Sequence, residues 1–426
     1  MSTFEFLNIL TDNYILFILC VIPCTLAYVL IANRFGKSWL NPLNFNLFTA
    51  GIGIGVALFL FCMGEAVSSS FMYVIISSII FWGILWFFFP RNTHNFKLKI
   101  KEEFLFSRKL FLSLYFGNII LQLLTYYLFG IPLFNDNSRL ATFTGSGGFG
   151  IISRITPFLS IYSIFYLYNK YIGAHSIKWF KLLLWLSPQI IFGVLSGSRS
   201  SFLVFIFSFW GYNKFYKDKE ILLSNFKVLL IPFLIISLFT FAIEHQTNVI
   251  GGALAFLERV AACGDLYWYA LPNDTWADVT VKTPFKDLLV GFLGPLRILS
   301  ESQTDVPIGY QLTQLVYTDF DKMTGPVELF PVSSLVYFGF YGGIIMVIFQ
   351  AFFACFFYKL FYRKSDSLIF SALLFFSFFK IVDFIGSLRN ATGQLFDILL
   401  NWGFVFILCL ILALLNILFH PLKNKH

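Results

Sequence analysis

The stretch YILFILCVIPCTLAYVLIA, residues 14–32, contains no charged side chain and ends just before Arg34. An α-helix of about 20 apolar residues crosses the hydrocarbon core of a bilayer, because each residue adds about 1.5 Å. The rest of the chain has the same character, since 58% of its 426 residues are hydrophobic and 12% are charged. We therefore predict an all-α polytopic membrane protein and exclude a soluble globular domain.

Further segments along the chain are apolar enough to follow the first across the membrane. We predict about eleven transmembrane helices, within a range of about ten to twelve. The predicted spans are 14–32, 45–64, 71–89, 110–130, 151–169, 180–196, 201–215, 226–243, 332–356, 367–385 and 394–417. Residues 1–13 lack a basic region, so we expect no cleavable signal peptide and a first span that stays in the membrane.

Lys and Arg residues decide the predicted orientation, because the short cytoplasmic connections of membrane proteins are enriched in both. Six connections hold 20 of the 30 Lys and Arg residues but only 5 of the 22 Asp and Glu residues. They are 33–44, 90–109, 170–181, 211–227, 357–366 and 418–426. We place them in the cytoplasm, which puts the N-terminus outside and the C-terminus inside. Topology thus explains the formal charge of +8, and we expect no nucleic-acid partner.

One long polar connection, residues 244–331, interrupts the spans and holds 11 of the 22 acidic residues. We predict three parts: a first transmembrane bundle at 1–243, this large outer loop at 244–331, and a last bundle at 332–426. Most of the acidic side chains of the loop should face water. Because parts of the loop are predicted to be short helices lying against the bilayer, the loop is expected to act as a lid that brings Arg259 and Arg297 over the outer mouth of the bundle.

Two short helices are predicted inside the large loop. Ile250, Leu254, Leu257 and Ala261 share one face at helical spacing within the apolar stretch 249–271. A twelfth crossing there would place the basic connection 357–366 outside, so the pattern favours an interfacial or re-entrant helix instead. The second short helix is predicted over 285–293, ending at Gly294-Pro295.

Arginine residues predicted on the outer side are candidates for binding a lipid pyrophosphate or a glycan. The guanidinium group is a permanently charged, planar fork that matches phosphate oxygens. The candidate substrate-binding residues are Arg139, Arg154, Arg199, Arg259, Arg297 and Arg389.

The sharpest motif is Ser196-Gly197-Ser198-Arg199-Ser200-Ser201, a very tight outer connection between two spans. Arg199 either reaches a lipid phosphate from a simple turn or points into the bundle and binds a substrate phosphate. We favour the second interpretation. The glycine-rich segment 144–150 precedes Arg154 and is either a flexible loop or an anion-binding nest. It is not an ATP-binding loop, because no Lys-Ser or Lys-Thr follows it.

Ionisable residues also occur inside the last predicted spans. Lys380 and Asp383 lie three positions apart, and Asp397 follows at the start of the next span. Charged groups at membrane depth normally face the protein interior and often line a pathway. The pattern is compatible with a structural ion pair, with a substrate site, or with proton coupling in a transporter.

A general base is sought among acidic and His residues of the large loop. We nominate Glu258, Asp265 and His245 as catalytic candidates. The six cysteines show no CxxC motif and no His/Cys spacing typical of a metal site. Accordingly, we expect neither a metal nor a cofactor.

Four features together resemble the Wzy-type O-antigen, or oligosaccharide-repeat-unit, polymerases. They are the Gly197-Ser198-Arg199 motif, the single large outer loop, Thr324-Gly325-Pro326 near its end, and the stretch LVYFGFYGG at 335–343. The resemblance implies a GT-C-like bundle in the bacterial inner membrane that acts on the periplasmic side. It also implies substrate-binding roles for Arg199 and for the loop residues Arg259 and Arg297.

Members of that family transfer a growing glycan from undecaprenyl diphosphate to a new lipid-linked repeat unit. The resemblance therefore implies a membrane glycosyltransferase whose partners are undecaprenyl-diphosphate-linked oligosaccharides, membrane lipids and a polysaccharide co-polymerase that sets chain length. Two alternatives stay open. One is an O-antigen ligase, which hands the glycan to lipid A-core, and the other is a lipid-linked oligosaccharide flippase or transporter.

Overall fold

The chain folds almost entirely into α-helices in the computed structural model. The structure describes residues 1–36, 38–90, 94–95, 108–132, 150–172, 179–196, 200–219, 258, 260–317, 325–382, 384 and 386–419. Within these residues, the one sheet pairs the two-residue strands β1 (His94–Asn95) and β2 (Arg363–Lys364) in parallel. The fold is thus all-α, as predicted.

The helices follow the predicted spans closely. They are α1 Thr3–Asp12, α2 Tyr14–Ala32, α3 Pro42–Cys62, α4 Ser68–Phe88, α6 Arg108–Phe129, α8 Gly150–Tyr171, α9 Trp179–Leu195, α10 Ser200–Gly211, α13 Asp265–Ala270, α14 Pro284–Leu293, α15 Ile308–Val316, α16 Phe330–Phe361, α17 Leu368–Val382 and α18 Leu388–Phe419. Short 3₁₀-helical turns cover Ala262–Gly264, Thr275–Asp278 and Glu301–Gln303, and a π-helical turn, Tyr212–Tyr216, continues α10.

Each predicted span except 226–243 coincides with one of these helices, and 226–243 lies outside the described residues. Seven helices are long and apolar enough to cross a membrane, and α9 and α17 are shorter apolar helices. The chain is therefore a multi-span membrane protein. The full count of about eleven spans and the GT-C-like arrangement stay predictions.

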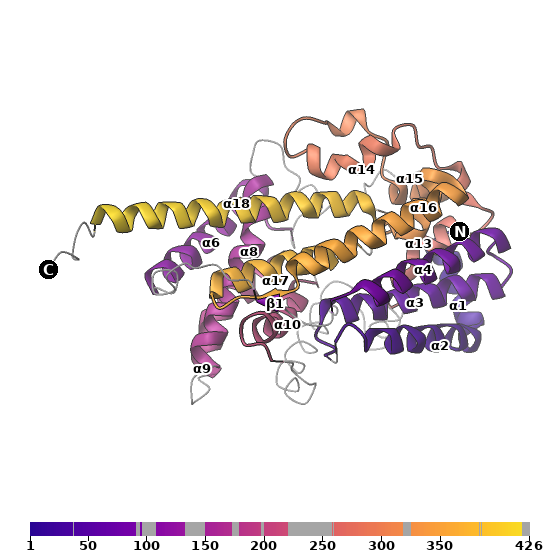
Figure 1. Ribbon diagram of the computed structural model, residues 1–426. Helices are drawn as coiled ribbons and strands as arrows, with labels where there is room; N and C mark the ends of the chain where they lie inside the picture. Colours follow the sequence, from indigo (N-terminus) through magenta and orange to yellow (C-terminus); the bar gives the residue numbers. More distant parts are fainter. Residues whose placement is uncertain are drawn as a thin grey trace.

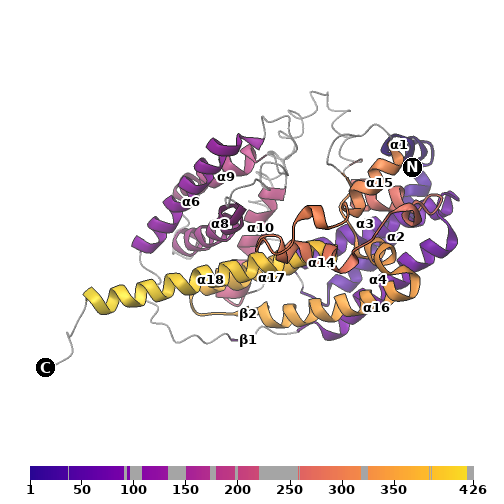
Figure 2. The ribbon, with the colours of Figure 1, turned by 90° about the horizontal axis from the view of Figure 1, so that it is seen from above.

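The helices form two groups joined by the C-terminal helices. Helices α1 to α4 lie at one end of the molecule, and α6, α8, α9 and α10 lie at the other (Figures 1 and 2). Between the groups, α16 packs along α4, whereas α17 and α18 both contact α8. Residues far apart in the sequence therefore meet in the middle of the molecule.

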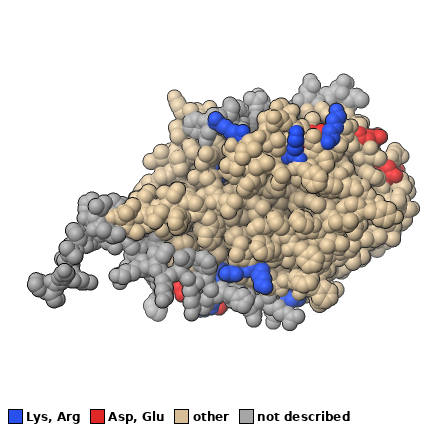
Figure 3. Space-filling view, turned by 45° about the horizontal axis from the view of Figure 1, so that its top comes forward, with Lys and Arg blue, Asp and Glu red and all other residues tan. Residues whose placement is uncertain are grey.

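Exposed apolar side chains mark the surfaces that would face lipid. On α2, Ile15, Leu19, Ile22 and Leu26 are all more than half exposed and share one helical face. Figure 3 shows a broad band without charge on the face in view, with Lys, Arg, Asp and Glu at its margins. Contact with the bilayer explains both observations, because lipid tails are the only solvent that makes such exposure favourable.

Contacts between the connections sort them into the two predicted sides. The strand pair β1–β2 and the Lys364–Asp218 ion pair, at 2.6 Å, join segments assigned to the cytoplasm. On the opposite side, Ala66 pairs with Pro272, and Thr3 Oγ1 and Tyr269 OH share a hydrogen bond of 2.9 Å. The division of the connections into two sides of the membrane is therefore self-consistent. Which of these sides faces the cytoplasm stays a prediction.

The described part of the predicted 249–271 helix is buried inside the protein, not spread on the membrane surface. Ala261, Leu266 and Trp268 are buried, and the segment packs against α3. A Cβ atom added at Gly53, near the middle of α3, would meet the Cys263 carbonyl oxygen at 3.0 Å. The interfacial alternative therefore does not describe residues 260–271, and the re-entrant alternative stays a prediction. The second prediction, 285–293, is confirmed by α14.

Helix α16 is broken one third of the way along by Gly339. This residue has φ 67° and ψ −169°, a conformation that L-residues with a side chain rarely adopt. The remaining stretch of α16 after the break is long enough for one crossing of the bilayer. The LVYFGFYGG stretch thus forms a kinked entry to the span, directly after the large loop.

Close approach of α2 and α3 generates a first prediction. A Cβ atom added at Gly55 would meet Val21 Cα at 2.6 Å, whereas a Cβ at Gly83 would meet nothing within 4 Å. We expect Gly55→Val to destabilise the protein by about 1–3 kcal/mol through overpacking, with a lower Tm in detergent. The matched control, Gly83→Val, should leave the Tm nearly unchanged. Equal Tm values for the two variants would show that the α2–α3 contact is not tight.

Candidate functional site

Helix α18 carries a stripe of polar side chains through its first half, which the predicted topology places on the outer side. Asn390, Gln394, Asp397 and Asn401 follow one another at intervals of three or four residues, so they share one face. A polar face on a membrane helix is stable only where it meets other polar groups of the protein. Asp397 and Asn401 are buried and Gln394 is half-buried, whereas Asn390 is exposed, so the stripe runs from the surface into the protein interior. Its two ends meet two different environments.

At the inner end of this stripe, one carboxylate lies between two cations. Asp397 is 7% exposed, and its Oδ1 accepts a hydrogen bond from the Arg154 guanidinium at the start of α8. Lys380 Nζ, near the end of α17, donates to Oδ2 of the same carboxylate at 3.0 Å. Asn401 Nδ2 donates to the Arg154 carbonyl oxygen at 3.0 Å and so helps to hold α8 against α18. Two cations and one anion give this ion cluster a net positive charge.

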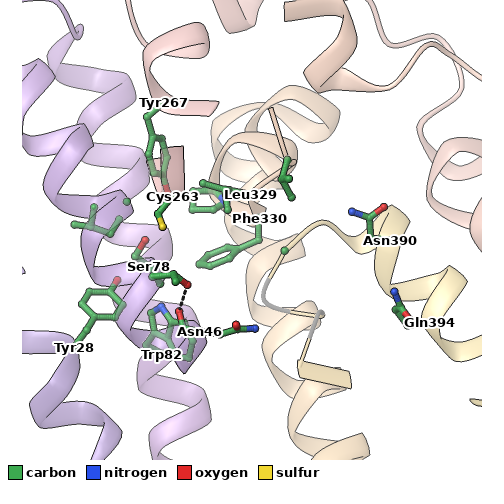
Figure 4. Close-up of a pocket in the computed structure, with 17 residues that line it drawn as sticks. Tyr28, Asn46, Ser78, Trp82, Cys263, Tyr267, Leu329, Phe330, Asn390 and Gln394 are labelled. Atoms are coloured by element: carbon green, nitrogen blue, oxygen red, sulfur yellow. Dashed lines mark hydrogen bonds between the residues drawn. The ribbon is translucent and has the colours of Figure 1, made fainter. Parts of the chain in front are cut away.

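At the outer end, the stripe borders the first cavity, a space of about 340 Å³ between α3, α4, α16 and α18. Figure 4 shows Tyr28, Trp82 and Tyr267 on one side of it, Phe330 in the middle, and Asn390 and Gln394 on the other side. Cys263 of the segment 260–271 closes it from above α3. The Gln394 Oε1 atom has no hydrogen-bond partner among the described residues.

The chemistry of the first cavity suits a ligand with apolar and hydroxylated faces. Aromatic rings offer flat apolar surfaces with a negative face that attracts C–H groups. Carboxamides can both donate and accept hydrogen bonds, and Gln394 retains an unused acceptor. A sugar ring combines such C–H and hydroxyl faces, whereas a lipid tail would leave the amides unpaired. The cavity therefore fits a sugar residue better than an acyl chain.

The outer loop is docked onto α18 by close backbone contacts and by one side-chain hydrogen bond. A Cβ atom added at Gly291 of α14 would meet the Gly393 nitrogen at 2.6 Å and the Arg389 oxygen at 2.7 Å. Thr392 Oγ1 donates a hydrogen bond to the Leu288 carbonyl oxygen at 2.6 Å. Helices α14 and α18 therefore cross closely, and the loop is held over the outer end of the polar stripe.

Two carboxylates, those of Asp287 and Glu328, lie near Arg389 at this end of the stripe. Glu328 Oε1 accepts a hydrogen bond from the Ile308 N–H at 3.2 Å, and Asp287 Oδ1 accepts one from the Asp305 N–H at 2.7 Å. The Arg389 guanidinium reaches the Asp305 carbonyl oxygen at 3.5 Å, a long hydrogen bond. Asp287 and Glu328 are only 1% and 6% exposed, so the expectation that loop carboxylates face water is wrong for these two.

Burial raises the pKa of the Glu328 carboxyl group above its ordinary value, although neighbouring Ser387 and Arg389 oppose the shift. Burial likewise raises the pKa of Asp287, and its hydrogen bond from Asp305 opposes that shift. Both carboxyl groups are therefore disfavoured as anions in the folded protein. Arg389 is the cation that offsets part of this cost.

The structure brings together only some of the residues predicted from the sequence. Arg154 belongs to the ion cluster. Arg389 lies beside the carboxyl groups of Asp287 and Glu328. Arg297 is exposed and forms no ion pair with a described residue, and Glu258 and Asp265 are half-buried and do not line the first cavity. The predictions for Arg139, Arg199, Arg259, His245 and Asp383 lie outside the described residues.

Sequence reasoning missed the amides of the polar stripe. Asn390, Gln394 and Asn401 precede and follow Asp397 at helical spacing within an apolar region, and that pattern could have revealed them. Asp287 and Glu328 carried no such signal. Their burial depends on where α14 and the residues before α16 pack, which the local sequence does not specify.

The described residues contain no group of three His, Cys, Asp or Glu side chains that could hold a metal ion. Comparisons with protein-family models, with curated proteins and with solved structures find no match to this chain.

The shared carboxylate generates a prediction about the ion cluster. Asp397→Asn leaves Lys380 and Arg154 without a counter-charge, so we expect a loss of about 3–5 kcal/mol. Lys380→Gln keeps the Arg154–Asp397 pair and should cost clearly less. Thermal unfolding of both variants in detergent measures the difference. A larger loss for Lys380→Gln would contradict the assignment of Asp397 as the shared partner.

Glu328 generates a prediction about pH. Because its pKa is raised in the folded protein, the folded state binds the proton more readily, and stability rises as pH falls through the folded pKa. Glu328→Gln stays neutral and keeps an acceptor for the Ile308 N–H. We expect its Tm to exceed that of the wild type at pH 8 and to match it near pH 4.5.

The control for this experiment is Asp278→Asn, because Asp278 is exposed. Its Tm should follow that of the wild type at both pH values. If the Tm difference between wild type and Glu328→Gln does not change with pH, Glu328 is not the group that titrates.

Proposed function

We propose that this protein is a membrane glycosyltransferase of the O-antigen polymerase type. It would transfer a growing glycan from undecaprenyl diphosphate to a new undecaprenyl-diphosphate-linked repeat unit on the periplasmic side of the bacterial inner membrane. Its partners would be the lipid-linked oligosaccharides, the surrounding lipids and a polysaccharide co-polymerase. The observation that carries the proposal is the first cavity, with its aromatic and amide walls, inside a multi-span membrane protein.

The position of the first cavity supports a lipid-linked substrate. It borders α3 and α4 on one side and the outer half of α18 on the other, beneath the docked loop. A substrate with a polyprenyl tail in the bilayer and a sugar outside needs such a site, with an apolar approach and a polar interior. Asn390 and Gln394 would hydrogen-bond sugar hydroxyls, and Phe330 or Tyr267 would pack against the ring.

The net positive ion cluster supports departure of a diphosphate. During transfer, an acceptor hydroxyl oxygen forms a bond with the anomeric carbon of the donor, and the bond from that carbon to diphosphate breaks. Its electron pair passes to the diphosphate oxygen, where negative charge develops. Arg154, Lys380 and, at the outer end, Arg389 are fixed cations that would stabilise this charge.

The hydroxyl proton needs a general base in this scheme. Asp265 is the described candidate nearest in sequence to Cys263 and Tyr267, which both line the first cavity, and it would have to turn toward that cavity to act, because it does not line it. Glu258 and His245 stay as sequence-based alternatives. The carboxylate would accept the proton as the new glycosidic bond forms.

A transporter or flippase is the second candidate function. The Lys380–Asp397 pair at membrane depth favours it, since transporters use such pairs to couple protons to substrate movement. An O-antigen ligase is a third candidate function. It would carry out the same glycosyl transfer as the polymerase and would differ only in its acceptor. The three functions leave different products in the cell.

Deleting the gene separates these functions, with lipopolysaccharide analysed by gel electrophoresis. A polymerase deletion should leave single repeat units on the lipid A-core, because the ligase still acts. A ligase deletion should leave none, and a flippase deletion should accumulate repeat units on the cytoplasmic face. A complete ladder of long chains after deletion would exclude both the polymerase and the ligase.

Variants expressed in the deletion strain test the residues. We expect Arg199→Ala to abolish long chains and Arg199→Lys to restore few of them, because a point charge does not replace the guanidinium fork. Gln394→Leu should reduce long chains at least about tenfold, since loss of one good polar contact to a sugar costs more than about 1.4 kcal/mol.

Lys286→Ala serves as the matched control, because Lys286 is exposed on the outer loop. It should give the wild-type ladder at the same protein level. A wild-type ladder from Arg199→Ala or from Gln394→Leu would remove that residue from the proposed site.

A further inference from the structure

A second cavity, of about 240 Å³, lies between α6, α8, α9 and α10. It shares no lining residue with the first cavity. Its lining includes Gln122, Ser153, Thr156 and Gln189, and it contains no charged side chain among the described residues. Such a space, rich in hydroxyl and amide groups, is unexpected within apolar helices, because each unpaired polar group is costly there.

Gln189 is the feature that points to a ligand. It is 5% exposed, and neither its Nε2 nor its Oε1 atom has a hydrogen-bond partner among the described residues. By contrast, Gln122 on α6 donates to Asn118 Oδ1 at 3.1 Å, and Asn118 donates to Ser160 Oγ at 3.0 Å. The hydroxyls of Thr125, Ser153, Thr156 and Ser196 donate to carbonyl oxygens of their own helices. Gln189 lines the cavity and retains both an unused donor and an unused acceptor.

The second cavity lies in the half of the bundle that is predicted to face outward. It is lined by the second halves of α6 and α9 and by the first halves of α8 and α10. In the predicted topology all four are outer halves. Helix α8 separates the second cavity from the ion cluster, because Ser153 lines the cavity while the adjacent Arg154 pairs with Asp397.

We propose that the second cavity binds a neutral sugar residue of a lipid-linked oligosaccharide, with the Gln189 amide as its main hydrogen-bonding group. The described lining offers hydroxyl and amide groups and no counter-charge, which suits a neutral moiety. An amide with a free donor and a free acceptor matches adjacent hydroxyls or an N-acetyl group. This inference rests on the proposed function, and it adds a second sugar site to the first cavity.

Thermal unfolding of the full chain in nanodiscs tests the inference. The probes are undecaprenyl-diphosphate N-acetylglucosamine and undecaprenyl-diphosphate galactose, with sugar-free undecaprenyl diphosphate as the reference. We expect at least one sugar-bearing lipid to raise the wild-type Tm further than the reference does. The difference between the two shifts is the sugar-dependent Tm shift.

Gln189→Leu is the decisive variant, because Leu fills a similar volume without polar atoms. Without lipid, its Tm should rise by about 2 °C or more, since an unpaired buried amide is removed. With lipid, the sugar-dependent shift should fall to half or less. Thr156→Val, which removes one hydroxyl from the same cavity, should also reduce the sugar-dependent Tm shift.

Gln394→Leu in the first cavity is the matched control, and the double variant should lose the sugar-dependent shift completely. If Gln189→Leu keeps the full shift while Gln394→Leu loses it, the second cavity is not a sugar site and the proposed function stands. A fall in Tm for Gln189→Leu without lipid would show that Gln189 is structural and would overturn the inference. A wild-type protein without any sugar-dependent shift would overturn both proposals.

Discussion

A buried charge in an apolar environment must be balanced, and in this protein Asp397 is the carboxylate on which three helices depend. Its two oxygens are bound by Arg154 of α8 and by Lys380 of α17. Because bilayer lipids cannot solvate these groups, the three helices are held in one arrangement. The position of α18 follows from this pairing, and with it the position of the amides that border the first cavity. A neighbouring face of α8, which includes Ser153 and Thr156, lines the second cavity.

In the half of the molecule that is predicted to face outward, close contacts at glycine residues set the positions of the helices. The segment 260–271 meets α3 at Gly53 and Gly264, and α14 meets α18 at Gly291. Such contacts need the absence of a side chain, so they define position more narrowly than apolar packing does. They place the walls of the first cavity on elements from opposite ends of the chain. Polar groups at the rim, such as Glu328, are buried as a consequence.

The sequence predicted the helices well because hydrophobic length is a strong local signal. The spans that became α2, α3 and α16 were evident from composition alone, and the re-entrant alternative for 249–271 was recognised from parity. Arg154, Arg389 and Asp397 were identified because charges are rare in such a chain. Burial of Asp287 and the pairing of Arg154 with Asp397 were not predictable, since both depend on contacts between residues far apart in sequence.

The contact between Gly291 and the backbone of α18 has a consequence for how this protein can change during evolution. Backbone atoms of Arg389 and Gly393 and the Thr392 hydroxyl oxygen lie within 3 Å of where a Cβ atom at position 291 would be, so that position must lack a side chain. A substitution of Gly291 would therefore push α14 away from α18. Exposed loop residues such as Lys286 take no part in this contact. Change on this loop is thus constrained at position 291 by packing and is free of that constraint on the exposed surface.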